Sequence, residues 1–378
     1  MRHLFTAFVL SLVALSCAAS CAKKSDAIVV GAYLSLSGSD SAFGVDTREG
    51  IELAIAEVNA AGGIKGRPIN VIYEDDKSLT TEASQTVRKL VDRDHVVALL
   101  GEAASGRSLV GGLIANTSQV PMITPSSTAV DVTKGREWVF RACFTDDAQG
   151  EAAARFVHDD LHKTKVGIFF AAQDTYSSGL AKTFREETAR LGGTVVVDRG
   201  YPKGETSFRT YLAELASAQP EIVFVPNYYN EMVTLARQAK ELGIPGTMFV
   251  GGDGWDASNL LEGAGAELEG AHFTNHYAPD VPWPQSKRFL EAFRSRYGRD
   301  PSSGNTLGYD AARLLADAMT RAPEPTRAAI RKALAETKDF AGATGTMSMD
   351  AGRNPKKPVV VVRIVNRRFT YATQLAPR

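Results

Sequence analysis

The chain has 378 residues, of which 44% are hydrophobic and 23% are charged, the composition of an ordinary globular protein. Its 43 Lys and Arg residues balance 43 Asp and Glu residues, and no basic run occurs, so the sequence lacks the electropositive footprint of a nucleic-acid-binding protein. A chain of this length is long enough for two domains.

The N-terminus differs in composition from the rest of the chain. Arg2 is followed by an apolar stretch over residues 4–15, which is too short to span a bilayer and is typical of a secretory signal peptide. A serine precedes both Cys17 and Cys21, as in a bacterial lipobox. We therefore expect residues 1–21 to be a lipoprotein-type signal peptide with Cys21, or else Cys17, as the lipidated residue. Cleavage without lipidation is the alternative.

The rest of the chain contains one cysteine, Cys143, so the exported part has no internal disulfide, and no second stretch is apolar and long enough for a membrane helix. From Ile28 onward, β-rich runs alternate with segments of helical periodicity. In the first half, strands are expected over 28–34, 69–75, 96–101 and 120–124, with helices over 47–63 and 80–94 and a third helix before the last strand. This alternation predicts βαβ units and a parallel sheet.

After residue 147 the same pattern restarts and predicts a second sheet. Its strands are expected over 165–170, 194–198, 221–226 and 247–252, with helices that include 179–193 and 230–243. Residues 270–284 are expected to form a Pro-rich loop that crosses back. Helices over 283–297, 304–321 and 324–337 and strands near 345–349 and 358–365 complete the chain. We interpret it as an α/β protein with two lobes and several crossings between them.

Motifs of the common enzyme classes are absent from the sequence. It contains no Walker loop, nucleophile elbow or HExxH, and no CxxC follows the N-terminal segment. His158 and His162 have helical i, i+4 spacing, but no third ligand lies nearby, which favours a solvated helix face over a metal site. Cys143 has no adjacent histidine and is expected to be a small core residue. The sequence thus predicts no enzyme, no metal and no cofactor.

Loops that follow the predicted strands are rich in hydroxyl and aromatic residues. They are "SLSGSDSAFG", "GEAASGRS", "TPSSTA", "AAQDTYSSG", "PNYYNEM" and "GGDGWDA". In open α/β sheets, ligands bind outside the carboxyl ends of the strands, so these loops favour a small polar ligand.

The ordered motifs along the chain resemble one known family. "IVVGAYLSLSGSDSAFGVDTREGIELAIAEVNAAGGIKGRPINVIYEDDKS" is followed in order by "VPMITPSSTA", "FRACFTDDAQG", "YSSGLAKTF", "PNYYNEM", "FVGGDG" and "GYDAARLLADAM". Together they resemble the type I periplasmic binding proteins of the leucine/isoleucine/valine-binding class, over about 350 residues.

The resemblance implies two Rossmann-like lobes with parallel central sheets, joined by a three-stranded hinge. Lobe 1 would comprise residues 27–143 and 276–356, and lobe 2 residues 144–275 and 357–378. It further implies a periplasmic, monomeric receptor that closes on an amino acid, by default a branched-chain one, and delivers it to an ABC permease, with contact to the membrane only through a lipid anchor.

The resemblance also implies which residues bind the ligand. Ser105, Ser126 and Thr128 match the positions that hold the α-carboxylate, with the N-terminal end of the helix at Ser105 behind them. Asp253 matches the acid that takes the α-ammonium group, although a glutamate is often found there. Aromatic residues that cover the ligand match Tyr176, Tyr228 and Phe43.

Each assignment has a structural alternative. Ser105 and Ser126 could be helix caps only, and Asp253 could stabilise a Gly-rich turn. Tyr229 is as good a candidate as Tyr228, and Arg107 could reach an acidic ligand group or point to solvent. Ser127 has no matched role.

Two features depart from the family pattern. Lys77 and Ala104 stand where some members have a disulfide, and the match near Gly304 and Asn305, where the ligand side chain is read, slips by one residue. Other amino acids, amides, urea or aromatic acids therefore stay open as ligands.

The alternative function is a sensor of the same fold, which would usually be fused to a membrane helix or an output domain. An enzyme with a hinged cleft would need an activated nucleophile or a metal set.

Overall fold

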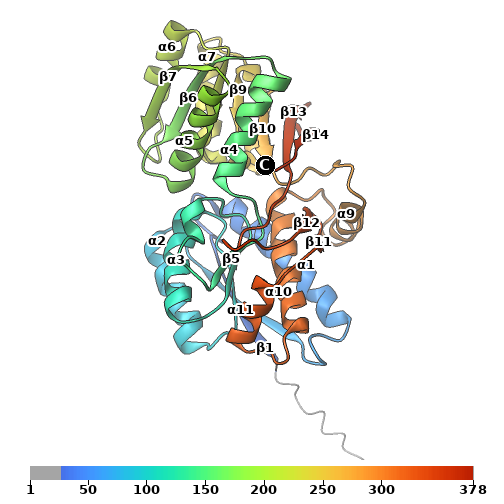
Figure 1. The fold of residues 1–378 in the computed structure, drawn as a ribbon. Helices are drawn as coiled ribbons and strands as arrows, with labels where there is room; N and C mark the ends of the chain where they lie inside the picture. The colour runs from blue at the N-terminus through green and yellow to red at the C-terminus, as the bar shows by residue number, and fades with distance from the viewer. Residues whose placement is uncertain (1–26, 378) are drawn as a thin grey trace, which may run out of the picture.

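Two separate sheets organise the chain in the computed structural model, which describes residues 27–377. Figure 1 shows them in two lobes stacked along the long axis of the molecule. The expected signal peptide, including Cys17 and Cys21, lies outside the described residues. None of the helices within residues 27–377 is long and apolar enough to cross a membrane.

The sheet of lobe 1 has five parallel strands in the order β2-β1-β3-β4-β5. These are β1 (Ile28–Leu34), β2 (Ile69–Asp75), β3 (Leu99–Leu100), β4 (Met122–Thr124) and β5 (Val139–Arg141). The helices of this lobe are α1 (Ser41–Ala60), α2 (Thr80–Arg88), α3 (Ser105–Thr117), α9 (Pro284–Tyr297), α10 (Ser303–Arg321) and α11 (Arg327–Ala335). A hairpin of β11 (Phe340–Gly342) and β12 (Gly345–Met347) lies beside them.

The core of lobe 1 explains why α1 and α10 form side by side although about 240 residues separate them. The apolar stripe of α1, which includes Ile51 and Ile55, packs with Val30 of β1 and Leu314 of α10 in one buried cluster. Gly50 allows this close approach, because a Cβ there would lie 1.9 Å from the Asn305 carbonyl oxygen. Hydrophobic burial therefore brings the C-terminal helices onto the N-terminal sheet.

The sheet of lobe 2 has seven strands in the order β14-β13-β10-β9-β8-β6-β7. They are β6 (Lys165–Ala171), β7 (Thr194–Tyr201), β8 (Ile222–Val225), β9 (Phe249–Gly251), β10 (His272–Asn275), β13 (Val359–Val365) and β14 (Arg368–Leu375). Helices α4 (Asp146–Arg155), α5 (Thr175–Arg190), α6 (Arg209–Ala218), α7 (Tyr229–Glu241) and α8 (Ser258–Ala264) accompany the sheet. Strands β6 to β10 are parallel, and β13 and β14 are added antiparallel at one edge.

The chain passes between the two sheets three times: after β5, after β10, and between β12 and β13. Lys357 joins two of these passages, because its buried ammonium group donates to the Ala142 carbonyl oxygen at 2.9 Å and to the Thr344 hydroxyl. Burial lowers the pKa of Lys357 to about 8, while the Asp310 carboxylate opposes this shift. The α/β class, the two lobes and the parallel sheets agree with the prediction.

Three local predictions differ from the structure. Helix α1 begins at Ser41, six residues earlier than expected, so part of the predicted first loop is helical. The crossing segment 270–284 contains β10, which is buried and pairs with β9 and β13. The antiparallel partner of β10 is β13, about 90 residues downstream, so no pattern within the segment itself predicts this strand. His158 and His162 do not share a helix face, because the π-helical turn Phe156–Asp160 ends before His162.

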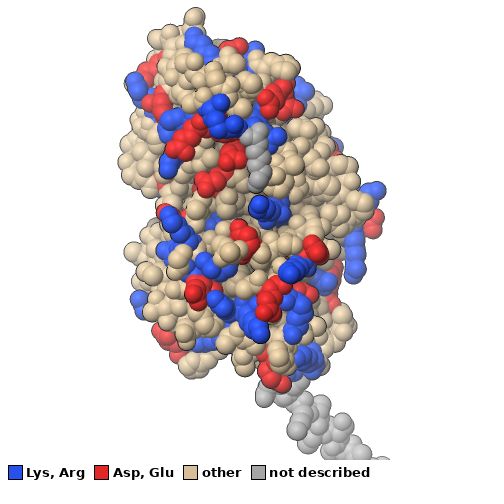
Figure 2. All heavy atoms as spheres, in the orientation of Figure 1, with Lys and Arg blue, Asp and Glu red and all other residues tan. Residues whose placement is uncertain are grey.

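Charged side chains of both signs are interspersed over both lobes on the face shown in Figure 2. This mixture agrees with the formal net charge of zero.

Candidate ligand-binding site

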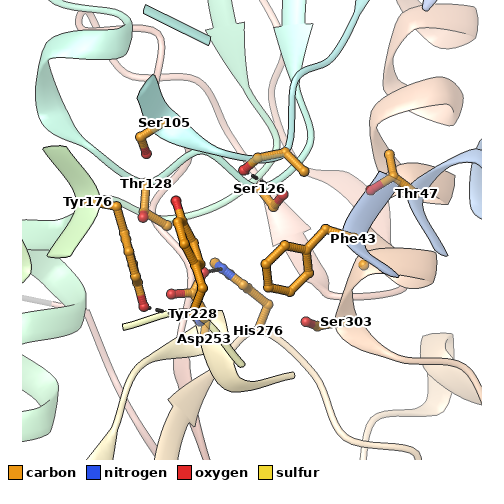
Figure 3. Close-up of a pocket in the computed structure, with 13 residues that line it drawn as sticks. Phe43, Thr47, Ser105, Ser126, Thr128, Tyr176, Tyr228, Asp253, His276 and Ser303 are labelled. Carbon is orange, nitrogen blue, oxygen red and sulfur yellow. Dashed lines mark hydrogen bonds and ion pairs between the residues drawn. The ribbon is translucent and has the colours of Figure 1, made fainter. Parts of the chain in front are cut away.

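Carboxyl ends of strands from both lobes meet around one cavity, whose empty space of ≈ 430 Å³ includes space that is open to solvent. Loops after β4, β8, β9 and β10 and the first turns of α3, α5 and α10 line it, together with α1. The lining residues are Phe43, Thr47, Ala103, Ser105, Ser126, Thr128, Tyr176, Tyr228, Asp253, Gly254, His276, Ser303 and Gly304, shown in Figure 3. A small ligand here would contact both lobes.

Three hydroxyl groups of lobe 1 face one region of this cavity. Ser105 begins α3, and its Oγ accepts a hydrogen bond from the Ala129 amide at 3.2 Å, which leaves its own proton for another acceptor. The Ser126 hydroxyl donates to the Ala103 carbonyl oxygen at 3.2 Å. Thr128 Oγ1 is buried and makes no hydrogen bond of normal geometry to the described residues. Neither serine caps a helix through its side chain. Ala104 precedes α3, Ala129 precedes the 3₁₀ turn Val130–Val132, and neither segment has a side-chain cap.

Asp253 approaches the same region from lobe 2. It begins the 3₁₀ turn Asp253–Trp255 after β9, and only 10% of its side chain is exposed. Oδ1 accepts a hydrogen bond from Gln149 Nε2 at 2.9 Å, and Oδ2 lies 3.1 Å from His276 Nε2. Burial lowers the pKa of His276, and contact with Asp253 opposes this shift. A carboxylate has about four acceptor positions, so Asp253 can still accept from a ligand cation.

Burial also raises the pKa of Asp146, a buried carboxyl near Thr128 and Asp253. The Thr128 hydroxyl opposes this shift and the Asp253 charge adds to it. Asp146 is therefore more readily protonated than an exposed aspartate, which leaves Asp253 as the acid that lines the cavity.

Aromatic rings form another wall of the cavity. Tyr176 and Tyr228 stack with ring centroids 5.1 Å apart and an interplanar angle of 12°. Phe43 of lobe 1 meets the edge of Tyr228 at 5.6 Å, so this contact crosses between the lobes (Figure 3). The Tyr176 hydroxyl accepts from the Gly254 amide at 3.1 Å, which fixes its ring beside Asp253.

Comparison with known proteins identifies the type of molecule. The sequence profile of a periplasmic binding protein family matches residues 27–368. The chain belongs to this family. It is 29% identical over 330 residues to the Leu/Ile/Val-binding protein homolog 2 of Brucella abortus (strain 2308), covering 87% of each chain.

Two solved structures of binding proteins are similar to the whole described chain. One is the leucine-binding protein LivK of Thermotoga maritima, with a TM-score of 0.88 and 34% identity, covering 93% of this chain and 99% of the other. The second is the branched-chain amino acid transporter substrate-binding protein LivJ of Streptococcus pneumoniae in complex with isoleucine, with a TM-score of 0.87, 34% identity and coverage of 93% and 100%. The protein is therefore an extracytoplasmic solute-binding protein of the ABC transporter type and not an enzyme.

All seven residues predicted for the site line the cavity of this binding protein: Phe43, Ser105, Ser126, Thr128, Tyr176, Tyr228 and Asp253. Tyr229 does not line it. Its hydroxyl instead donates to the Ser39 carbonyl oxygen of lobe 1 at 2.9 Å and accepts from the Ala42 amide at 3.4 Å. Ser127 is buried behind the cavity, where its hydroxyl contacts Ser108 and the Glu102 carbonyl oxygen.

Both alternatives considered for Arg107 are wrong. Its guanidinium is buried and lies 2.8 Å from Asp40, 3.0 Å from Glu102 and 3.7 Å from Asp76. These acids come from three different loops of lobe 1, so their convergence on one arginine is visible only in three dimensions.

Sequence reasoning missed three polar residues of the cavity, namely Thr47, His276 and Ser303. His276 follows β10, and the rule that ligands bind after strands would have found it if β10 had been predicted. Thr47 lies within a helix and had no such signal.

Proposed function

We propose that this binding protein is the receptor of an ABC importer and captures a small α-amino acid between its lobes. The observation that carries the proposal is the opposition of Asp253 on lobe 2 to Ser105 and Thr128 on lobe 1 around one end of the cavity, with Ser126 between that end and Phe43. The acid suits an α-ammonium group, and the hydroxyls with the first turn of α3 suit an α-carboxylate. Branched-chain amino acids are the first candidates, because the relatives above are named for them.

Closure of the lobes on the ligand follows from the same arrangement. A ligand held by Asp253 and by Thr128 contacts both lobes and so favours their closed arrangement over an open one. The contact of Tyr229 with Ser39 supports a closed state, because it also joins the two lobes. The closed receptor would then dock on the permease of its transporter.

Calorimetry of the protein without residues 1–21 tests the ligand class. Each α-amino acid is compared with its 2-hydroxy acid, which lacks the ammonium group, and with its amine, which lacks the carboxylate. We expect at least one α-amino acid to bind. Either analogue should bind with an affinity ~10 to 150-fold lower, since a charged hydrogen bond contributes ~1.5–3 kcal/mol. Equal binding of the 2-hydroxy acid would refute the role of Asp253. Binding of only an amide, urea or an aromatic acid would refute the ligand class.

Uptake by cells distinguishes transport from sensing. A strain that lacks the protein should lose uptake of the radiolabelled ligand and regain it with the wild-type gene but not with Asp253→Asn. Unchanged uptake, with an altered transcriptional response to the ligand, would favour the sensor alternative.

We further propose that lipid attached to Cys21, or else to Cys17, holds the receptor at the membrane. Mass spectrometry of the membrane fraction from Cys21→Ala and Cys17→Ala strains tests this. The variant of the lipidated cysteine should lose the acylated N-terminus, and an unmodified N-terminus in the wild type would contradict the proposal.

A further inference from the structure

The cavity has two chemically different ends. In Figure 3, Ser105, Thr128, Tyr176 and Asp253 gather at one end, while Thr47 and Ser303 lie at the other. If the first end holds the α-carboxylate and α-ammonium groups, the side chain of the ligand must extend toward the second. The second end, which we call the distal end, therefore contacts the side chain of the ligand and determines which side chains bind.

Thr47 at the distal end has an unpaired hydroxyl. It lies in α1 and is fully buried, and its Oγ1 has no hydrogen-bond partner among the described residues. A threonine inside a helix usually bonds the carbonyl three or four residues earlier, as Thr320 of α10 does with Ala316 at 2.8 Å. The Thr47 hydroxyl instead points toward the cavity in Figure 3. A buried hydroxyl without a partner destabilises the protein, so a ligand atom that bonds it restores the lost free energy.

Ser303 adds a second polar group to the distal end. Its amide donates to the buried Asp256 carboxylate at 2.8 Å. Burial raises the pKa of Asp256, and hydrogen bonds from Asn275 and Ser303 oppose this shift. Ser303 itself lines the cavity, and a serine hydroxyl can donate to a ligand group or accept from one.

The charge of the distal end is the third observation. None of the thirteen residues that line the cavity is Lys or Arg, so an acidic side chain would find no cation. Asp256 is engaged by Asn275 and Ser303, and Asp46 is engaged by Arg299 and Ser302, so a basic side chain would find no free acid there. Gly304 also lines the cavity, and a Cβ at this position would lie 3.3 Å from Asp46 Cβ, so this turn of α10 packs closely against α1.

From these contacts we propose that the cavity selects α-amino acids whose side chain ends in a neutral hydrogen-bonding group, a hydroxyl or a carboxamide, over aliphatic side chains of the same size. Thr47 and Ser303 are the residues that determine this specificity. The inference rests on the proposed function, because it takes the α-amino acid as the ligand class. It replaces the branched-chain side chain, which the names of the relatives suggest first, with a polar one.

Pairs of ligands with nearly equal shape test the proposal on the wild-type protein. Threonine is compared with valine, asparagine with leucine, and glutamine with methionine, by calorimetry under the same conditions. We expect the polar member of at least one pair to bind ~10-fold or more tightly than its aliphatic partner, because a site with unpaired polar groups rejects a ligand that cannot bond them. Aliphatic members that bind as well as or better than the polar ones in every pair overturn the proposal.

A Thr47→Val variant then assigns the preference to its residue. The replacement keeps the shape of the side chain and removes the hydroxyl. Thr47→Val should lower the affinity for the preferred polar ligand ~10-fold, while the affinity for the matching aliphatic ligand stays the same or rises. Thr47→Ser should retain the preference for the polar ligand. Thr320→Val, in a helix of the same lobe but outside the cavity, serves as the matched control and should change the affinity for neither ligand. If the ratio of the affinities for the polar and the aliphatic ligand is the same in Thr47→Val as in the wild type, the role of Thr47 is overturned.

The two proposals fail in different ways. If no α-amino acid binds, the proposed function is wrong. If α-amino acids bind and the aliphatic members are preferred, the proposed function stands and this inference is wrong.

Discussion

His276 Nε2 and Asp253 Oδ2 lie 3.1 Å apart, and the imidazole ring stacks on Phe144 with centroids 3.7 Å apart. Because burial lowers the pKa of His276, its neutral form can donate Nε2–H to the carboxylate. Gln149 holds the other oxygen at 2.9 Å. The acid proposed to bind the ligand ammonium is thus oriented from both sides, by Gln149 of α4 and by His276 directly after β10.

His276→Phe should therefore weaken binding without unfolding the protein. The phenyl ring keeps the stacking on Phe144 and removes one donor from Asp253, so we expect a loss of ~2 to 10-fold in affinity for the amino acid. The 2-hydroxy acid analogue should be affected less, because it has no ammonium charge to pair with Asp253. Calorimetry with both ligands measures the difference, and an equal loss for both would indicate a general structural effect.

Removing the hydroxyls of Ser126 and Thr128 should separate binding from stability. The Ser126→Ala/Thr128→Ala double variant should lose ~10-fold or more in affinity but remain folded, since these hydroxyls face the cavity. Ser127→Ala is the matched control. Its hydroxyl has only protein partners, so we expect a destabilisation of ~1–3 kcal/mol with unchanged affinity. Affinities from calorimetry and urea unfolding curves of both variants check this, and unchanged binding in the double variant would contradict the carboxylate site.

Tyr229→Phe should shift the protein toward an open arrangement of the lobes. The variant loses the 2.9 Å bond to Ser39 but can keep its ring contact with Phe43, whose centroid lies 5.0 Å away. Since a net hydrogen bond contributes ~0.5–1.5 kcal/mol, affinity should fall by ~2 to 10-fold although no residue of the cavity changes. Small-angle scattering with and without ligand, together with calorimetry, measures both effects. Tyr211→Phe, at a partly buried residue that packs against the core of lobe 2, should leave the affinity unchanged.

Arg107→Met should strongly destabilise lobe 1. It would leave Asp40, Glu102 and Asp76 buried without their cation, and removal of one partner from a buried ion pair costs ~3–5 kcal/mol. Arg48→Met is the control, because its pair with Glu52 is exposed and should contribute no more than ~0.5 kcal/mol. Urea unfolding of both variants at pH 7 measures the difference, and similar values would contradict a structural role for Arg107.

His272 should make the stability depend on pH. Burial, with a smaller effect from Arg363, lowers its pKa from 6.5 to about 4. As pH falls below 6.5, the unfolded chain binds a proton at His272 that the folded protein does not bind until pH is near 4, so the fold loses stability across this window. The histidine is partly exposed, which reduces the effect to ~1–2 kcal/mol.

His272→Gln removes this contribution. The unfolding free energy of the wild type, relative to the variant, should therefore fall by ~1–2 kcal/mol between pH 7 and pH 4. A constant difference across this range would show that His272 titrates normally in the fold.

Several features of this protein could be predicted from the sequence because they depend on local patterns. The apolar spacing of Ile51, Ala54 and Ile55 marks the buried face of α1, and the β-rich runs before "TPSSTA" and "GGDG" mark strands whose ends carry the site. Because parallel strands of one sheet direct their carboxyl ends to one edge, Ser126 and Thr128 could be placed near Ser105 without coordinates.

Other features depend on contacts between distant segments. Strand β10 is stabilised by pairing with β13, about 90 residues downstream, so neither it nor His276 at its end had a local signal. Arg107 meets its three acids because the loops after β1, β2 and β3 lie at one edge of the sheet. Thr47 faces the distal end of the cavity because α1 packs against α10. The sequence by itself determined the class of fold and the residues that line the end of the cavity where we propose that the constant part of an amino acid binds. Only the tertiary structure decided which polar groups lie at the distal end of the cavity, because burial and hydrogen-bond pairing of a side chain such as Thr47 depend on long-range packing.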